Sequence, residues 1–213
     1  MKTRFIMVRH GFSVANDKKC FAGNSDFELT ELGRRQAERC AEALKKEKID
    51  AIYASDLQRA YQTAMPIAKA LGLEINKSRG LREIFAGKWE GMLFEDLCVK
   101  YADDYSVWRQ DIGRAVCTEG ESVRELSARV LSTLENIAAA NYGKVICIAT
   151  HATPIRAVCT AAAGLDASEM AKISWVSNAS ISIIDYEDGR FIPVSINNSN
   201  HLGDIITVFP ANV

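Results

Sequence analysis

Three short runs in this chain are apolar throughout, and a helical pattern follows each of them. They cover residues 5–8, 51–54 and 145–149. Apolar runs of this length, without alternating polar residues, are typical of strands that are buried on both faces of a parallel sheet. The repeated order of strand and helix therefore predicts an α/β fold, a three-layer α/β/α sandwich with a mostly parallel sheet.

Periodicity and end signals predict the remaining elements. Thr30 is a candidate N-cap for one helix, Ser55 and Asp56 for the next, and residues 121–141 have a clear apolar face. Pro66 is expected to kink or shorten its helix. Further predicted elements are a strand at 73–75, two short helices within 92–108, a helix at 154–163, and a hairpin of 181–186 with 191–196.

Composition excludes several classes of protein. Apolar residues make up 48% and charged residues 25%, as in ordinary soluble proteins, and a net charge of −1 provides no basic surface for nucleic acid. No apolar run approaches the ~20 residues of a membrane span, and the amino terminus does not resemble a signal peptide. Six cysteines without a C-x-x-C pair predict buried free thiols. We therefore expect a cytoplasmic protein with no nucleic-acid and no membrane partner.

Residues that can bind an anion follow each of the three apolar runs. Arg9, His10 and Gly11 follow the first, Arg59 lies one helical turn beyond the second, and His151 follows the third. The carboxyl ends of parallel strands share an edge, so two imidazoles and two guanidiniums should meet in one crevice, where the glycine would leave room for a ligand. Guanidinium groups donate bidentate hydrogen bonds to phosphate, which makes a phosphate ester the expected ligand.

The cations also predict the role of His10. Neighbouring arginines disfavour a charged imidazole, so this ring should be neutral and able to act as a nucleophile. A phosphoryl group held by Arg9, Arg59 and His151 would have its charge spread over donors that are already in place. An acid for the leaving alkoxide is still required.

A series of longer motifs runs in order along nearly the whole chain. They are Arg9-His10-Gly11 with Asn16, Asp26-x-x-Leu29-Thr30-x-x-Gly33-x-x-Gln36-Ala37, Ser55-Asp56-x-x-Arg59-x-x-Gln62-Thr63-Ala64, Leu81-Arg82-Glu83, Gly87-x-Trp89-Glu90-Gly91, Gly120-Glu121-Ser122, His151, and Asn197 to His201-Leu202. This series resembles the histidine phosphatase superfamily, also called phosphoglycerate mutase-like.

The resemblance implies a role for each of five residues. His10 would form a phosphohistidine, and Arg9, Arg59 and His151 would surround the phosphate. Glu83 would be the general acid that later activates water. Neither a metal nor another cofactor is implied.

The resemblance also implies further contacts to the substrate, with two departures from the family pattern. Asn16 and the backbone of Gly23 would line the same pocket. Ala152 stands at a substrate-binding position where the family most often has glycine, so a methyl group would border the phosphate. Ala22 replaces a larger polar residue of many relatives. His201 is expected to order the carboxyl-terminal segment and to take no part in catalysis.

The expected fold is one domain, 1–213, with a helical insertion at about 84–122 that covers the active site like a lid. The insertion contains four basic and eight acidic residues, a net charge of −4, which should repel a bisphosphate. Aromatic and apolar residues expected to shape the leaving-group pocket are Phe85, Met92, Tyr105, Trp108 and Cys117.

These observations predict a metal-independent, histidine acid phosphatase-type phosphomonoesterase that acts on a small-molecule phosphomonoester. Two alternatives stay open, a cofactor-dependent phosphoglycerate mutase and a non-catalytic phosphate-binding module. A binder would need the cations but not His10 and Glu83 together. Sugars, nucleosides and other small metabolites are not distinguished as leaving groups. A homodimer is compatible with the sequence.

Overall fold

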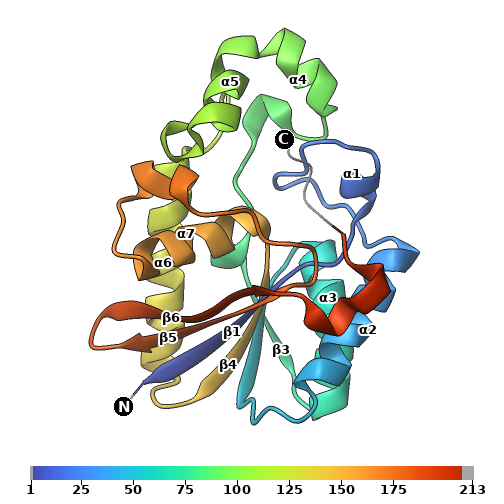
Figure 1. Cartoon of the computed structure of the whole chain (residues 1–213), viewed down its shortest axis with the longest axis vertical. Coiled ribbons are helices and arrows are strands. Elements are labelled where there is room, and N and C mark those ends of the chain that lie inside the picture. Colours follow the sequence, from blue (N-terminus) through green and yellow to red (C-terminus); the bar gives the residue numbers. More distant parts are fainter. Residues whose placement is uncertain (1, 208–213) are drawn as a thin grey trace.

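One six-stranded sheet forms the centre of the computed structural model, which describes residues 2–207. The strand order is β3-β2-β4-β1-β5-β6 (Figure 1). The first four strands in the sequence pair in parallel, and β5 pairs antiparallel with both β1 and β6, which confirms the mostly parallel sheet. Their bounds are Thr3–Arg9 for β1, Ala51–Ser55 for β2, Ile75–Ser78 for β3, Val145–Thr150 for β4, Ile181–Glu187 for β5 and Arg190–Asn198 for β6.

Helices cover both faces of this sheet, so the three-layer sandwich is confirmed (Figure 1). Phe5 and Met7 of β1 belong to one core cluster, and Ile6 and Val8 to the other. This alternation buries each strand on both sides. The first cluster contains α6 (Val123–Ala140) and α7 (Ala152–Ala162), and the second α2 (Glu31–Leu44) and α3 (Gln58–Leu71).

The helix ends agree only partly with the sequence predictions. Thr30 caps α2 by accepting from the Gly33 amide at 3.1 Å, as predicted. Ser55 and Asp56 are not the cap of α3, since its N-cap is Leu57, which makes no side-chain cap hydrogen bond. Both side chains have partners in other elements. The helix also continues through Pro66 and is not shortened.

Two further local predictions differ from the structure. The third strand begins at Ile75 and runs to Ser78, beyond the predicted 73–75, because its pairing with β2 starts at Ile52 and ends at Ser55. The long segment after β1 contains a short helix, α1 (Val14–Asp17), which Ser13 caps. Short 3-10 helices occupy Arg79–Leu81, Gly87–Trp89, Ile112–Arg114, Ala167–Lys172 and Asn200–Ile205.

The insertion at 84–122 lies beyond the carboxyl ends of the parallel strands, at the top of Figure 1. It contains the helices α4 (Phe94–Lys100) and α5 (Ala102–Gln110). The chain enters it at Phe85 and leaves it at Glu121, and the Glu121 amide donates to the Phe85 carbonyl at 2.8 Å. We call this insertion the lid. That the chain is a single domain stays a prediction, and residues 1 and 208–213 lie outside the described part.

The cysteines are all free thiols, and five of the six are buried. Burial raises the pKa of the Cys40 thiol. Within residues 2–207 no helix has the length and apolar character needed to cross a bilayer.

Candidate active site

The ends of β1 and β4 bring two histidines together. These strands pair in parallel with Arg9 opposite Thr150, and the His10 amide donates to the Thr150 carbonyl at 2.9 Å. His10 and His151 directly follow the last residues of these strands, and the centroids of their rings are 5.2 Å apart. Only 5% of His10 and none of His151 is exposed. The predicted convergence of the strand ends is therefore present.

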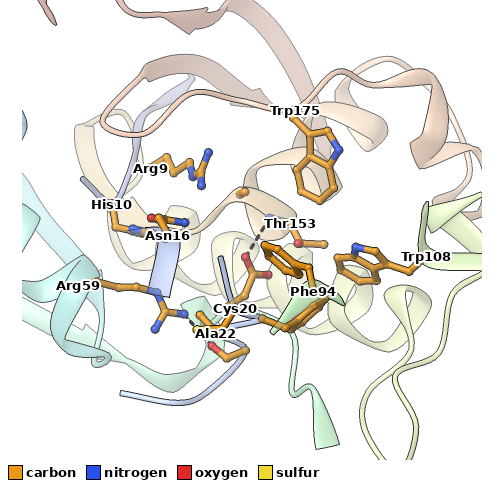
Figure 2. Close-up of a pocket in the computed structure, with 14 residues that line it drawn as sticks. Arg9, His10, Asn16, Cys20, Ala22, Arg59, Phe94, Trp108, Thr153 and Trp175 are labelled. Atoms are coloured by element: carbon orange, nitrogen blue, oxygen red, sulfur yellow. Dashed lines mark hydrogen bonds between the residues drawn. The ribbon is translucent and has the colours of Figure 1, made fainter. Parts of the chain in front are cut away.

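A pocket opens beside His10 (Figure 2). Polar residues and small residues form one part of its lining, and aromatic residues form the other. Its lining consists of Arg9, His10, Asn16, Cys20, Phe21, Ala22, Gly23, Arg59, Glu83, Phe94, Trp108, Ala152, Thr153 and Trp175.

The hydrogen bond of His10 fixes its tautomer. Nδ1 lies 2.8 Å from the carbonyl oxygen of Gly11. A carbonyl oxygen can only accept, so Nδ1 carries the hydrogen and Nε2 carries the lone pair. Burial lowers the pKa of this imidazole well below its usual range, and the charges of Arg59 and Arg9 lower it further. His10 is thus neutral with a free nucleophilic nitrogen.

His151 lies behind the pocket surface and does not line it. Its Nε2 shares a hydrogen bond of 2.8 Å with the hydroxyl of Ser55, which also accepts from the Leu57 amide at 3.3 Å. Its Nδ1 has no hydrogen-bond partner among the described residues. Burial is the main cause that lowers the pKa of this imidazole, and the charge of Arg59 adds to it. Contact of His151 with phosphate stays a prediction.

Arg9 and Arg59 are both buried at the pocket. Arg9 Nη1 donates to the Val176 carbonyl at 2.5 Å. The two Nη atoms of Arg59 donate to the carbonyls of Ser25 and Gly23 at 2.9 and 2.7 Å, while its Nε has no partner among the described residues. Burial lowers the pKa of each guanidinium to about 10. Both therefore keep their positive charge at neutral pH.

Hydrogen bonds join the loop that carries Gly23 to the lid. Glu90 accepts hydrogen bonds from the amides of Asn24 and Ser25 at 2.8 and 2.6 Å. Gly23 has a φ of +47°, and a Cβ on it would lie 2.4 Å from a carboxylate oxygen of Glu90. Glycine is thus required here for the backbone to border the pocket and to hold Arg59.

Glu83 lies at the amino-terminal end of α7. One of its carboxylate oxygens accepts from the Ile84 amide at 2.9 Å, and the other from the Thr153 amide at 3.3 Å. Ala152 and Thr153, the first residues of α7, line the pocket beside it.

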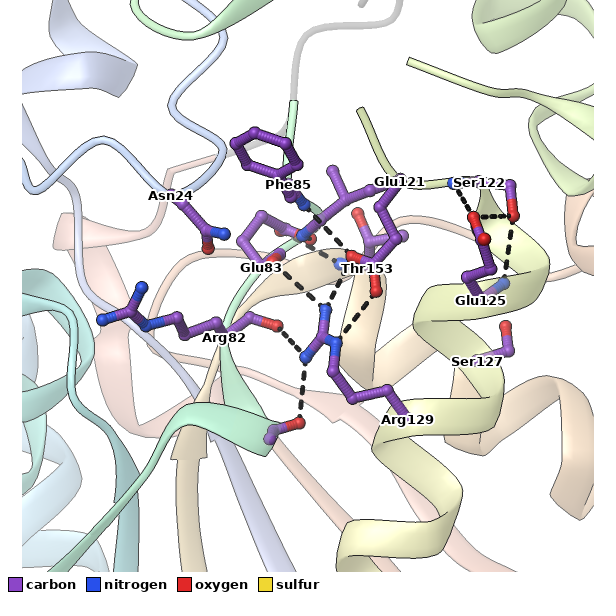
Figure 3. Close-up of polar contacts among 12 residues, drawn as sticks. Asn24, Arg82, Glu83, Phe85, Glu121, Ser122, Glu125, Ser127, Arg129 and Thr153 are labelled. Carbon is purple, nitrogen blue, oxygen red and sulfur yellow. Dashed lines mark hydrogen bonds and ion pairs between the residues drawn. The ribbon is translucent and has the colours of Figure 1, made fainter. Parts of the chain in front are cut away.

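Arg129 on α6 holds the segment that carries Glu83 (Figure 3). Its guanidinium donates to the carbonyls of Gly80, Arg82 and Glu83 at 3.0, 3.1 and 3.3 Å. It also donates twice to the carboxylate of Glu121, at 2.9 and 2.8 Å. The same carboxylate accepts from the Phe85 amide at 3.1 Å. One group of hydrogen bonds therefore joins the segment that carries Glu83 to both ends of the lid.

Asn178, which the sequence analysis did not identify, supports the side of the site formed by His10 and Asn16. Its Nδ2 donates to the His10 carbonyl at 3.1 Å and to Oδ1 of Asn16 at 3.2 Å. Asn16 Oδ1 also accepts from the amide and the hydroxyl of Ser13. With that oxygen occupied, the Asn16 side-chain NH₂ is the group available to a ligand. Asn178 lies in an irregular segment, where neither a motif nor a period marks it.

Glycine is needed at position 11 for a different reason from the predicted one. A Cβ on Gly11 would lie 2.5 Å from the carbonyl oxygen of Gly33 in α2. The space beside Gly11 is therefore filled by the backbone of α2 and is not left for a ligand. The amide of Gly11 donates to the Thr63 hydroxyl at 3.0 Å, which joins the loop to α3 as well.

The lid contributes other residues than those predicted. Trp108 lines the pocket, but Phe85, Met92, Tyr105 and Cys117 do not. Phe94 of the lid lines it instead, together with Phe21 and Trp175 from outside the lid, and none of these three was predicted. The acidic residues of the lid are also absent from the described lining, and two of them, Glu90 and Glu121, bind backbone amides or Arg129 instead. Repulsion of a bisphosphate by the net charge of the lid stays a prediction.

His201 is absent from the described lining of the pocket. Its Nε2 is 3.0 Å from the Ala179 carbonyl and 3.3 Å from Cys40 Sγ. Among residues 2–207, no three His, Cys, Asp or Glu side chains are grouped so that they could hold a metal ion.

Comparisons with known proteins agree with this geometry. The model of the histidine phosphatase superfamily (branch 1) matches residues 5–199. Phosphoserine phosphatase 1 of Hydrogenobacter thermophilus is 34% identical over 201 residues, which cover 94% of this chain and 95% of the relative. Phosphoglycerate mutase-like protein 4 of Arabidopsis thaliana is 33% identical over 189 residues, which cover 86% and 80%.

A solved structure shows the same fold. The native structure of a mycobacterial glucosyl-3-phosphoglycerate phosphatase superposes with a TM-score of 0.84 at 28% identity, and the match covers 93% of this chain and 100% of that one. The phosphatases among these proteins support hydrolysis of phosphate esters as the activity. By its sequence and its fold, this chain belongs to the histidine phosphatase superfamily.

Proposed function

We propose that this protein is a metal-independent phosphomonoesterase that hydrolyses a small-molecule phosphate ester through a phosphohistidine on His10. The observation that carries the proposal is the neutral His10, with its Nδ1 bound to the Gly11 carbonyl, between two buried arginines. A dianionic phosphoryl group compensates the charges of Arg9 and Arg59.

The reaction has two steps in this proposal. His10 Nε2 attacks phosphorus while the ester P–O bond breaks, and Glu83, in its protonated form, gives its proton to the leaving oxygen. The Glu83 carboxylate then takes a proton from water, whose oxygen attacks phosphorus and breaks the P–N bond. Inorganic phosphate leaves, and both side chains return to their starting states. Arg9, Arg59, Asn16 and His151 stabilise the charge on the phosphoryl oxygens.

The two alternative functions have weaker support. A mutase must also hold a second anionic group of its substrate, and the only cationic residues in the described lining are Arg9 and Arg59. A phosphate-binding module would need neither a neutral imidazole nor a carboxylate beside the cations. Hydrolysis uses every one of these groups.

Phosphate release from a panel of monoesters, measured with EDTA present, tests the proposal. The wild type and the His201→Gln control should release phosphate, and His10→Ala should not. Radiolabelled phosphate should remain on the wild-type protein after an alkaline quench. Loss of activity in EDTA would overturn the metal-independent reaction. Interconversion of phosphoglycerates faster than phosphate release would favour a mutase, and binding without turnover would favour a binding module.

A further inference from the structure

The two parts of the pocket lining differ in chemistry. In Figure 2, Arg9, His10, Asn16 and Arg59 lie on one side and the aromatic residues on the other, with Thr153 between them. The second part, which we call the aromatic half, consists of Phe21, Phe94, Trp108 and Trp175. None of these side chains carries a charge at neutral pH.

The direction of the proposed reaction places the leaving group in the aromatic half. Phosphoryl transfer needs the attacking and the leaving atoms roughly in line, so the alcohol points away from His10. Glu83 binds the Thr153 amide, between the two halves, where a proton can reach the leaving oxygen.

The aromatic half is built before substrate binds. Phe21 makes an edge contact with Trp108 at a centroid distance of 4.9 Å, and Trp108 lies 6.3 Å from Trp175. The guanidinium of Arg156 stacks on the Trp175 ring at 4.1 Å and donates to the carbonyls of Met170 and Ile173. Rings held in this way offer flat surfaces at little cost in side-chain entropy.

Trp108 also provides a donor without an acceptor. Only 4% of this residue is exposed, and its Nε1 has no hydrogen-bond partner in the described part of the chain. Its indole points toward Thr153 in Figure 2. A buried N–H that lacks an acceptor destabilises the protein, so an oxygen of the ligand that accepts from it would bind favourably.

From this arrangement we infer that the substrate is a monoester of an uncharged alcohol with a flat, apolar face and an oxygen that accepts a hydrogen bond from Trp108 Nε1. The inference rests on the proposed function and concerns only its leaving group. A carboxylate or an ammonium group placed in the aromatic half would lose water without gaining a charged partner there. A small zwitterion such as phosphoserine, the substrate in the name of the bacterial relative, should therefore be a poor substrate of this protein.

Three alkyl esters of increasing fit test this inference. They are phosphoserine, benzyl phosphate, which has a ring, and 4-methoxybenzyl phosphate, which has a ring and an acceptor oxygen. We expect kcat/KM to rise in this order, with at least about a tenfold step from phosphoserine to the benzyl ester. The Trp108→Phe variant keeps a ring but loses the N–H, so the advantage of the methoxy ester, about fivefold, should disappear.

Val107→Ala, a change on the same helix outside the pocket lining, is the matched control and should leave all three values unchanged. Equal or faster hydrolysis of phosphoserine that depends on His10 would overturn the inference and leave the proposed function standing. An unchanged preference for the methoxy ester in Trp108→Phe would overturn the role of the indole. If that variant does not fold, the order of the wild-type values decides. Hydrolysis that persists in His10→Ala would refute the proposed function itself.

Discussion

The rings of His10 and His151 lie with their centroids 5.2 Å apart, and neither is hydrogen-bonded to a carboxylate among the described residues. His10 is bound to a carbonyl and His151 to a hydroxyl. Two protonated imidazoles at this distance would repel each other and the nearby arginines. The pair is therefore a neutral unit within a cationic site, and this has a consequence for stability.

The first prediction is a loss of stability as the pH falls below about 6.5, the usual pKa of histidine. The folded protein has lowered pKa values at His10 and His151, so the unfolded chain binds more protons between those values and about 6.5. Each ring should reduce the free energy of unfolding by up to about 1.4 kcal/mol per pH unit in that window, and neither contributes above it.

Urea unfolding at pH 7, 6 and 5 measures this effect, and the double variant His10→Asn/His151→Asn should have a flatter profile. The lowered pKa values of Asp56 and Asp185 act mainly below about pH 4 and so lie outside this window. Equal slopes in the two proteins would show that these rings are not the cause.

The second prediction concerns Glu83→Gln, which removes the proposed acid but keeps the shape of the side chain. For an alkyl phosphate, kcat/KM, which reports the step that phosphorylates His10, should fall about 10²- to 10⁴-fold. The fall should be much smaller for 4-nitrophenyl phosphate, because that leaving group needs no proton. Glu119→Gln, at an exposed lid carboxylate paired with Lys88, is the control and should leave both rates unchanged. Equal losses for the two substrates would argue against a role in protonation.

The third prediction is that Arg129 acts through Glu83. Arg129→Gln removes the hydrogen bonds that hold the segment carrying Glu83. As a result, kcat for alkyl esters should fall about 10- to 100-fold with little change in KM. Loss for 4-nitrophenyl phosphate should again be smaller. The effects of Arg129→Gln and Glu83→Gln should not add in the double variant.

Arg124→Gln, an exposed change on the same helix, is the control for Arg129 and should be neutral. An effect of Arg129→Gln on thermal stability alone, with kcat unchanged, would reduce Arg129 to a structural residue.

The fourth prediction is that Gly11→Ala is not tolerated. The new methyl group would meet the Gly33 carbonyl oxygen at 2.5 Å, and this atom belongs to the backbone of α2. We expect a loss of about 1–3 kcal/mol in the free energy of unfolding, together with a lower kcat, because the loop also carries His10. A variant with wild-type stability and turnover would show that α2 moves freely.

The parts of the site that follow strand ends could be predicted from the sequence. His10 and His151 come directly after buried strands, and sheet geometry alone brings such residues together. The family motifs also identified Glu83, which lines the pocket together with His10. Local sequence patterns therefore predicted the polar part of the site.

The parts that depend on packing between distant segments could not be predicted. Asn178 and Trp175 lie in an irregular segment, and only the folded chain brings them to His10 and Trp108. Ser55 was taken for a helix cap because a serine before a helix usually is one. Its hydroxyl binds His151, a contact over 96 residues of sequence that no local pattern contains.

The attachment of the lid at Phe85 and Glu121 has a consequence for the evolution of such proteins. Its two ends are hydrogen-bonded to each other, so an insertion of another length or sequence can be joined to the same two points. The histidines, the arginines and Glu83 all lie outside the exchanged segment. The lid supplies Phe94 and Trp108 to the aromatic half, so replacement of this one stretch would change these two surfaces, while Phe21, Trp175 and the groups proposed for phosphate transfer would stay in place.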